Sequence, residues 1–144
     1  MIGLVITGHL NFASGYQSAV NAIVGDSPQV EYVDFLESMS TIELEQQIRQ
    51  ASRSVDDGDG VLFLTDIPGG SPCQRSAKVA ADLDEADVIS GTNLAMAAEA
   101  CLERDGMKLE KLVTQLIETG VENIKSVRQQ MCAVKSREVM DDGI

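Results

Sequence analysis

The sequence predicts an α/β domain with a doubly wound, mainly parallel sheet of four strands and with helices on both faces. Short apolar runs of strand length alternate along the chain with segments whose apolar residues recur at helical spacing. Repeated strand-helix units are joined by right-handed crossovers, which place helices on the two faces of a parallel sheet. The 144 residues and the 44% hydrophobic content match one domain that can bury a core.

The first half of the chain contains two strand-helix units. Residues 2–7 (IGLVIT) predict a buried strand, and residues 16–24 carry apolar side chains at helical spacing. Residues 30–35 (VEYVDF) predict the second strand. The next helix is expected to begin after Ser40, because Ser40 and Glu43 have the spacing of a capping box. The buried stripe expected for this helix consists of Leu44, Ile48, Ala51 and Val55.

The second half of the chain continues the alternation. Residues 61–65 (VLFLT) are apolar almost throughout, as expected for a central parallel strand covered on both faces. Ser71 is the expected N-cap of the following helix, with Pro72 at the first helical position. Residues 87–90 predict the fourth strand, which a further helix follows, and a last helix is expected over about 108–128.

The end of the chain is expected to lie outside the main domain. Residues 133–144 are mixed and charged, so they are interpreted as a tail or as an extra edge strand of the sheet, after one domain over residues 1–132. No apolar run approaches the roughly 20 residues of a membrane span. Residues 1–6 lack the basic start of a signal peptide. A cytoplasmic location is expected from these features.

Composition and charge argue against several classes of function. A formal net charge of −12 does not suit a surface that binds nucleic acid or an anionic membrane. The cysteines at 73, 101 and 132 have no C-x-x-C spacing, which favours reduced thiols over a disulfide framework or a zinc site. The single histidine excludes a histidine-rich metal site, and the glycine motifs for dinucleotides and nucleoside triphosphates do not occur. We expect neither a metal nor an organic cofactor.

Three polar loops are expected to meet at the carboxyl edge of the sheet. Ligands of open parallel sheets bind beyond the carboxyl ends of the strands, at the point where the strand order reverses. His9 follows the first strand, residues 66–71 follow the third, and residues 91–93 follow the fourth. If the first and third strands are neighbours, His9 and Asp66 leave the sheet at the same level and can meet.

The residue types in these loops point to phosphoryl transfer. A carboxylate at Asp66 that accepts a hydrogen bond from one imidazole nitrogen of His9 leaves the other nitrogen unprotonated as a nucleophile. Gly69, Gly70 and Ser71 lead into a helix, whose free N–H groups favour phosphate. Histidine alone can accept a phosphoryl group, so the sequence predicts a nucleophile beside an anion-binding loop.

Each of these residues also has a structural alternative. His9 can be an incidental loop residue, Asp66 can cap a turn or the next helix, and Asn93 is as readily a helix N-cap as a ligand group. The Gly-Gly-Ser-Pro segment is also an ordinary loop-to-helix sequence. Cys73 lies near a helix start, but Val79 occupies the position where a phosphatase needs arginine, so Cys73 is interpreted as a packing residue.

Four segments of the sequence together carry a resemblance to a known family. They are ITGHLNFASG at 6–15, VDF at 33–35, GVLFLTDIPGGSP at 60–72 and VISGTNLAM at 88–96. In order and spacing, over about residues 1–128, they resemble the mannose-type enzyme IIA components of the phosphoenolpyruvate-dependent sugar phosphotransferase system. The first and last segments are most similar to the N-acetylgalactosamine/galactosamine branch.

The resemblance implies a histidine phosphocarrier. His9 matches the family's phosphorylated histidine, which accepts a phosphoryl group from the phosphocarrier protein HPr and passes it to a IIB component. Asp66 matches the aspartate that bonds the ring. Ser71 and the adjacent loop amides match the groups that hold the phosphoryl oxygens, with Asn93 nearby.

The resemblance also implies an assembly. Family members form homodimers in which a C-terminal strand adds to the partner's sheet, and they serve membrane components IIC and IID indirectly. Leu10-Asn11 depart from the small residues, often glycine, that follow the histidine in the family, and Cys73-Gln74 depart from an apolar-Asn pair. The alternative function is a non-catalytic regulatory module that binds a phosphorylated metabolite at the Gly69–Ser71 loop.

Overall fold

The structure is a computed structural model that describes residues 1–142. It contains a four-stranded sheet in the order β2-β1-β3-β4. Every neighbouring pair of strands is parallel. The strands are β1 (Gly3–His9), β2 (Val30–Phe35), β3 (Val61–Thr65) and β4 (Ala86–Ile89). The helices are α1 (Phe12–Val24), α2 (Thr41–Val55), α3 (Ser71–Ala80), α4 (Leu94–Glu103), α5 (Leu109–Glu122) and α6 (Val127–Asp142).

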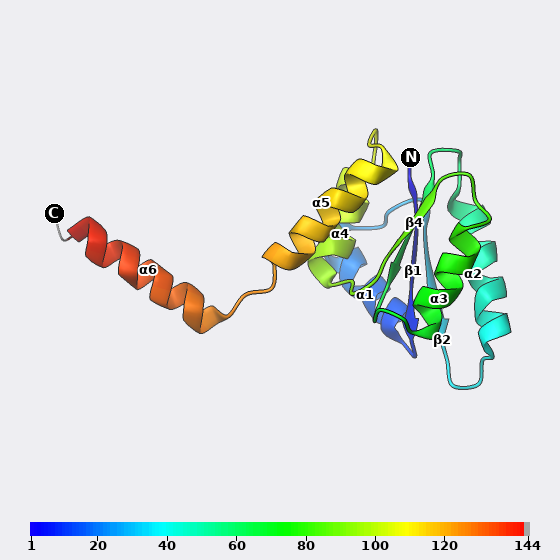
Figure 1. Cartoon of the computed structure of the whole chain (residues 1–144), viewed down its shortest axis with the longest axis horizontal. Coiled ribbons are helices and arrows are strands. Elements are labelled where there is room, and N and C mark those ends of the chain that lie inside the picture. Colours follow the sequence, from blue (N-terminus) through cyan, green and yellow to red (C-terminus); the bar gives the residue numbers. More distant parts are fainter. Residues whose placement is uncertain (143–144) are drawn as a thin grey trace.

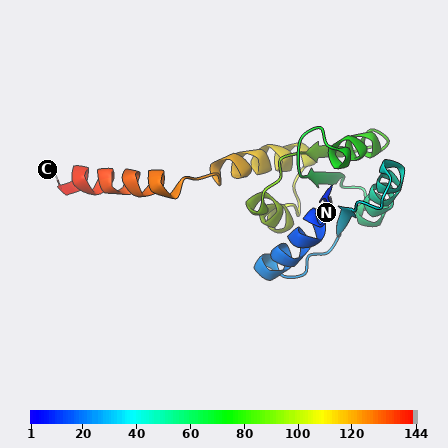
Figure 2. The same cartoon turned by 90° about the horizontal axis from the view of Figure 1, so that it is seen from below.

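Helices cover both faces of the sheet, as the sequence predicts. Helices α1, α4 and α5 lie on one face, and α2 and α3 lie on the other (Figures 1 and 2). Because successive strand residues point to opposite faces, Leu4 and Ile6 of β1 join the core under α1, α4 and α5, while Val5 joins the core under α2 and α3. Strands β1 and β3 are buried on both faces, which explains their continuous apolar runs.

The starts of α2 and α3 agree with the sequence to within one residue. Ser40 caps α2: its hydroxyl accepts a hydrogen bond from the Glu43 N–H at 3.1 Å, and the Glu43 carboxylate accepts one from the Ser40 N–H, which confirms the capping box. Helix α3 begins one residue earlier than predicted. Its N-cap is Gly70, and Ser71 is its first helical residue.

The C-terminal segment differs most from expectation. The last helix, expected to reach about residue 128, ends at Glu122, and α6 follows from Val127 to Asp142 and points away from the body (Figure 1). Residues 133–142 are therefore helical, and the structure has no extra edge strand there; residues 143–144 lie outside the described part. Residues 127–140 are exposed, so burial does not favour a strand there. The helix propensity of the residues in this segment therefore decides its local structure.

The buried Arg104 joins the amino ends of the first two strands. Its guanidinium donates hydrogen bonds to the carbonyl oxygens of Ile2 and Gln29, both at 2.9 Å, to the Pro28 carbonyl oxygen and to the Ser27 hydroxyl. Burial lowers the pKa of this group below its ordinary value. Within residues 1–142, no helix combines the length and the apolar character that crossing a membrane requires.

Candidate functional site

The structure brings His9 and Asp66 together, as the sequence predicts. Strands β1 and β3 are neighbours, and their register pairs Thr7 with Thr65, so the segments that follow the two strands leave the sheet at the same level. The imidazole Nδ1 of His9 lies 2.6 Å from Oδ2 of Asp66. The backbone N–H of His9 donates to the same oxygen at 2.7 Å. This double contact fixes both the histidine backbone and its ring.

The His9 ring is accessible although its partner is not. The His9 side chain is 43% exposed, and the Asp66 side chain is 11% exposed. Phe35 at the end of β2 packs against the imidazole, with 5.9 Å between the ring centroids. Gly70 lies close to the opposite part of the ring: a Cβ there would lie 2.8 Å from Cε1 and 3.6 Å from Nε2. Nε2 therefore faces the start of α3.

The electrostatics of the pair favour a nucleophilic Nε2. Burial alone would raise the pKa of Asp66, but the hydrogen bonds from the His9 backbone and imidazole lower it, and the net pKa lies below the ordinary value of 3.8. The carboxylate is consequently ionised at neutral pH and accepts a hydrogen bond from the Nδ1–H of His9. In the neutral imidazole this tautomer leaves the lone pair on Nε2 free.

The loop from Gly69 to Ser71 places a helix start beside Nε2. Gly69 has a φ of +76°, a conformation that glycine adopts without steric cost, and its carbonyl oxygen accepts a hydrogen bond from the Gln74 side chain at 2.8 Å. The first N–H groups of α3, those of Ser71 and Cys73, have no acceptor within the helix. They lie at the positive end of the helix dipole, so this position favours an anion next to the imidazole.

The loop at residues 91–93 holds the backbone of Asp66 in place. The Gly91 N–H donates to the Asp66 carbonyl oxygen at 2.6 Å, which holds the Asp66 backbone. The Asn93 side chain caps α4 by accepting a hydrogen bond from the Met96 N–H at 3.2 Å, and its amide N–H donates to the Gly120 carbonyl oxygen at 2.9 Å. Both polar atoms of Asn93 thus serve packing of the helices, the alternative that the sequence left open.

Phe35 is a site residue to which the sequence assigned no role. The β1–β2 register pairs His9 with Phe35, so the aromatic ring lies beside the imidazole. Phe35 is the last residue of the VDF segment, but only the register of the two strands shows that its ring lies beside His9. Among residues 1–142, no group of three or more histidine, cysteine, aspartate or glutamate side chains could hold a metal ion.

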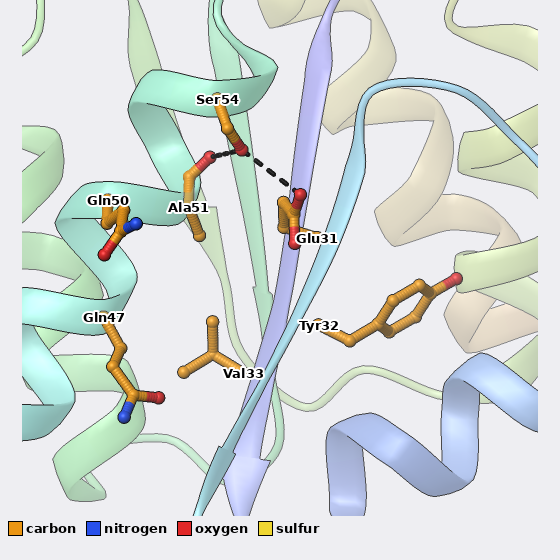
Figure 3. Close-up of a pocket in the computed structure, with 7 residues that line it drawn as sticks. All are labelled: Glu31, Tyr32, Val33, Gln47, Gln50, Ala51 and Ser54. Carbon is orange, nitrogen blue, oxygen red and sulfur yellow. Dashed lines mark hydrogen bonds between the residues drawn. The ribbon is translucent and has the colours of Figure 1, made fainter.

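A separate groove of about 450 Å³ lies between β2 and α2, away from His9 (Figure 3). Its polar wall is internally bonded: the Ser54 hydroxyl contacts the Glu31 carboxylate at 3.3 Å and donates to the Ala51 carbonyl oxygen at 2.9 Å. Gln47 and Gln50 complete this wall, and the Tyr32 ring points away from it (Figure 3). The lining contains neither histidine nor cysteine.

If His9 accepts a phosphoryl group, as the sequence predicts, alanine at Gly70 should slow this reaction about tenfold, because the new Cβ would displace the ring from its aligned position. Gly106→Ala is the matched control, because Gly106 has a similar φ of +72° and lies in the turn between α4 and α5, outside the loop beside His9. A Cβ there meets no atom within 4 Å, so its left-handed backbone costs stability, about 1 kcal/mol, without touching the ring. Phosphorylation rates and urea unfolding of both variants separate the effects. Equal rates in Gly70→Ala and the wild-type chain would contradict the described contact.

Fold and site together define a class of protein. The protein is an open parallel α/β domain whose strand order reverses between β1 and β3. At that point lie a histidine-carboxylate pair and the start of α3. The profile of the family described as "PTS system fructose IIA component" matches residues 3–117. The chain belongs to this family of IIA components of the sugar phosphotransferase system (PTS).

Individual relatives agree with this assignment. The chain is 29% identical over 128 residues to the mannose-specific PTS EIIAB component of Escherichia coli (strain K12). The aligned residues cover 88% of this chain and 40% of that protein. The chain is 28% identical over 136 residues to the fructose-specific EIIA component of Bacillus subtilis (strain 168), with 94% and 88% covered. The crystal structure of component EIIA from Streptococcus agalactiae superposes with a TM-score of 0.79 at 32% identity, over 90% of this chain and 99% of that one.

Proposed function

We propose that this chain is a cytoplasmic phosphocarrier in which Nε2 of His9 accepts a phosphoryl group from phosphorylated HPr and passes it to a IIB component. The transfer would drive uptake and phosphorylation of a hexose or an amino sugar. The observation that carries the proposal is the 2.6 Å contact between His9 Nδ1 and Asp66 Oδ2, combined with the exposed ring. The resemblance of the His9 and Asn93 segments favours N-acetylgalactosamine or galactosamine as the sugar.

The proposed step is a displacement at phosphorus. The lone pair of Nε2 forms the new N–P bond while the bond between phosphorus and the donor side chain breaks, and the donor atom keeps that electron pair. Because Nδ1 of His9 keeps its proton, the phosphorylated ring becomes cationic. The ionised Asp66 carboxylate at 2.6 Å stabilises this developing charge. Transfer to the next protein reverses the same bond changes.

The start of α3 supplies the groups for the phosphoryl oxygens. Charge on three equatorial oxygens must be stabilised during phosphoryl transfer. The N–H groups of Ser71 and Cys73 and the Ser71 hydroxyl are the donors at this helix start, beside Gly70 and the ring. We assign binding of the phosphoryl group to the Gly69–Ser71 loop, and we assign Asn93 to support of α4.

The direct test is phosphorylation of the full chain. Incubation with phosphoenolpyruvate, enzyme I and HPr should give an acid-labile, base-stable phosphoprotein, and adding a IIB component should remove the label. Absence of label on the wild-type chain would contradict the proposal. Binding of a phosphorylated metabolite without any label would support instead a regulatory module that uses the Gly69–Ser71 loop.

Formation of a homodimer belongs to the same proposal. Strand β4 has β3 as its only neighbour in the described part of the sheet. A groove beside it is lined by apolar side chains. Those side chains are Ile89, Met96, Ile117, Val121 and Ile124. Burying such an edge and such a patch between two copies would remove an exposed strand edge.

We expect light scattering after size exclusion to give twice the chain mass of 15.4 kDa. Val121→Glu is expected to shift the protein toward the monomer, because Val121 is 66% exposed within this apolar patch and the change places a carboxylate there. Glu122→Gln, one position away and also exposed, is the control. A monomeric wild-type chain at micromolar concentration would contradict the dimer.

A further inference from the structure

We propose that the Leu10 side chain is a docking contact for the protein that delivers the phosphoryl group to His9. This inference rests on the proposed function and names a residue that determines partner fit. The reasons are a strained backbone at Leu10, an exposed side chain that the core does not use, and an apolar surface around the reactive ring.

Leu10 has a φ of +50°, in the left-handed region that favours glycine. A bulky side chain is an outlier in this region, and such a conformation costs about 1–2 kcal/mol for an L residue. The backbone conformation itself has a clear use. The Leu10 N–H donates to the Phe35 carbonyl oxygen at 2.8 Å, which holds the end of β2 against the chain after His9. Glycine would make the same hydrogen bond with less strain, so the bond does not account for leucine.

Packing does not account for leucine either. The Leu10 side chain is 51% exposed, and it belongs to neither of the two apolar cores. A half-exposed apolar side chain outside both cores adds little packing, while the left-handed backbone costs leucine free energy that glycine avoids. Strain of this kind persists where a side chain serves a function. The side chain lies directly after the residue that would react.

Two further apolar side chains are exposed at the same edge of the sheet. Leu36 follows β2 and is 42% exposed, and Ile67 follows β3 and is 57% exposed. Because β1 lies between β2 and β3, the three residues follow adjacent strands at the edge of the sheet that carries the exposed ring of His9. We refer to Leu10, Leu36 and Ile67 as the apolar rim. A donor that places phosphorus on Nε2 must approach across this rim.

The charge of this chain indicates which charges the surface of the donor protein should carry. Twenty of the 23 acidic residues lie within residues 1–122, together with only seven of the eleven basic residues. Of these seven, Arg104 is buried, and Arg49, Arg75 and Lys78 pair with carboxylates. The exposed Glu37 adjoins the rim. The partner that fits is a protein whose phosphorylated side chain lies in an apolar patch flanked by lysine or arginine.

The test compares two phosphoryl donors on the same variants. With phosphorylated HPr as donor, Leu10→Gly is expected to raise KM about tenfold at unchanged kcat, the effect of losing one buried apolar contact at an interface. Leu10→Ala is expected to raise KM similarly, although it retains the left-handed strain. Ile23→Ala removes a side chain of similar exposure, 58%, near the far end of α1 and is expected to keep the wild-type KM.

Phosphoramidate, a small phosphoryl donor without a protein surface, reports on the chemistry of His9 itself. The rate of labelling by phosphoramidate is expected to stay the same in Leu10→Gly while KM for HPr rises. A parallel fall in both would overturn the docking role, because it would show a disturbed ring. An unchanged KM for HPr would also overturn it and leave the phosphocarrier proposal standing. Failure of HPr to label the wild-type chain would contradict the phosphocarrier proposal, and the docking role with it.

Discussion

His9→Gln is expected to take up no phosphoryl group from HPr, whereas the wild-type chain becomes labelled. His9 is the only histidine of the sequence, so no second imidazole can replace it. A glutamine amide is not a nucleophile toward phosphorus, and this makes the expected loss complete. Intact-mass measurement after incubation with phosphoenolpyruvate, enzyme I and HPr gives the occupancy directly.

The fold of His9→Gln should remain intact, which makes the result specific. The contact between the backbone N–H of residue 9 and Asp66 Oδ2, at 2.7 Å, does not depend on the side chain. The His9 side chain is 43% exposed, so its replacement leaves no buried cavity. Unchanged circular dichroism and a cooperative urea transition are the controls. Base-labile label on this variant would place the phosphoryl group on a hydroxyl such as that of Ser71 and would contradict the assignment to His9.

The strand-helix alternation was readable because burial on both faces leaves a direct pattern. The predicted second and third strands, 30–35 and 61–65, have the bounds of β2 and β3. The pattern fails after residue 122, where α6 has no core to face and no apolar stripe that separates helix from strand. Arg104 was also beyond prediction, because its acceptors come from the amino ends of β1 and β2, far away in the sequence.

The pairing of His9 with Asp66 was predictable from topology alone, since residues at the carboxyl ends of neighbouring parallel strands must lie close together. The contacts that complete the site depend on strand register and loop backbone. Phe35 reaches the imidazole through the β1–β2 register, and Gly70 approaches it through the turn before α3. The left-handed conformation of Leu10 likewise has no sequence signal, because glycine is the residue that usually marks it.

Asp66→Asn is expected to slow phosphorylation of His9 on the order of 10³-fold while leaving the fold in place. An amide can still accept a hydrogen bond, but it carries no charge to stabilise the cationic phosphorylated ring. It also has N–H donors that can favour the wrong imidazole tautomer. Rapid-quench kinetics with phosphorylated HPr measure the rate. Asp84→Asn removes the same charge from an exposed position before β4, at the opposite end of the sheet, and should leave the rate unchanged.

The pH dependence of stability provides an independent test of the same pair. Because the folded pKa of Asp66 lies below its ordinary value of 3.8, the ionised carboxylate stabilises the fold fully above that value. This contribution disappears as the pH falls through the lowered pKa. Urea unfolding of Asp66→Asn should therefore show a smaller loss of stability than the wild-type chain between about pH 5 and pH 2. Parallel curves for the two proteins, together with equal phosphorylation rates, would remove Asp66 from the mechanism, since its effect depends on an ionised carboxylate bonded to His9.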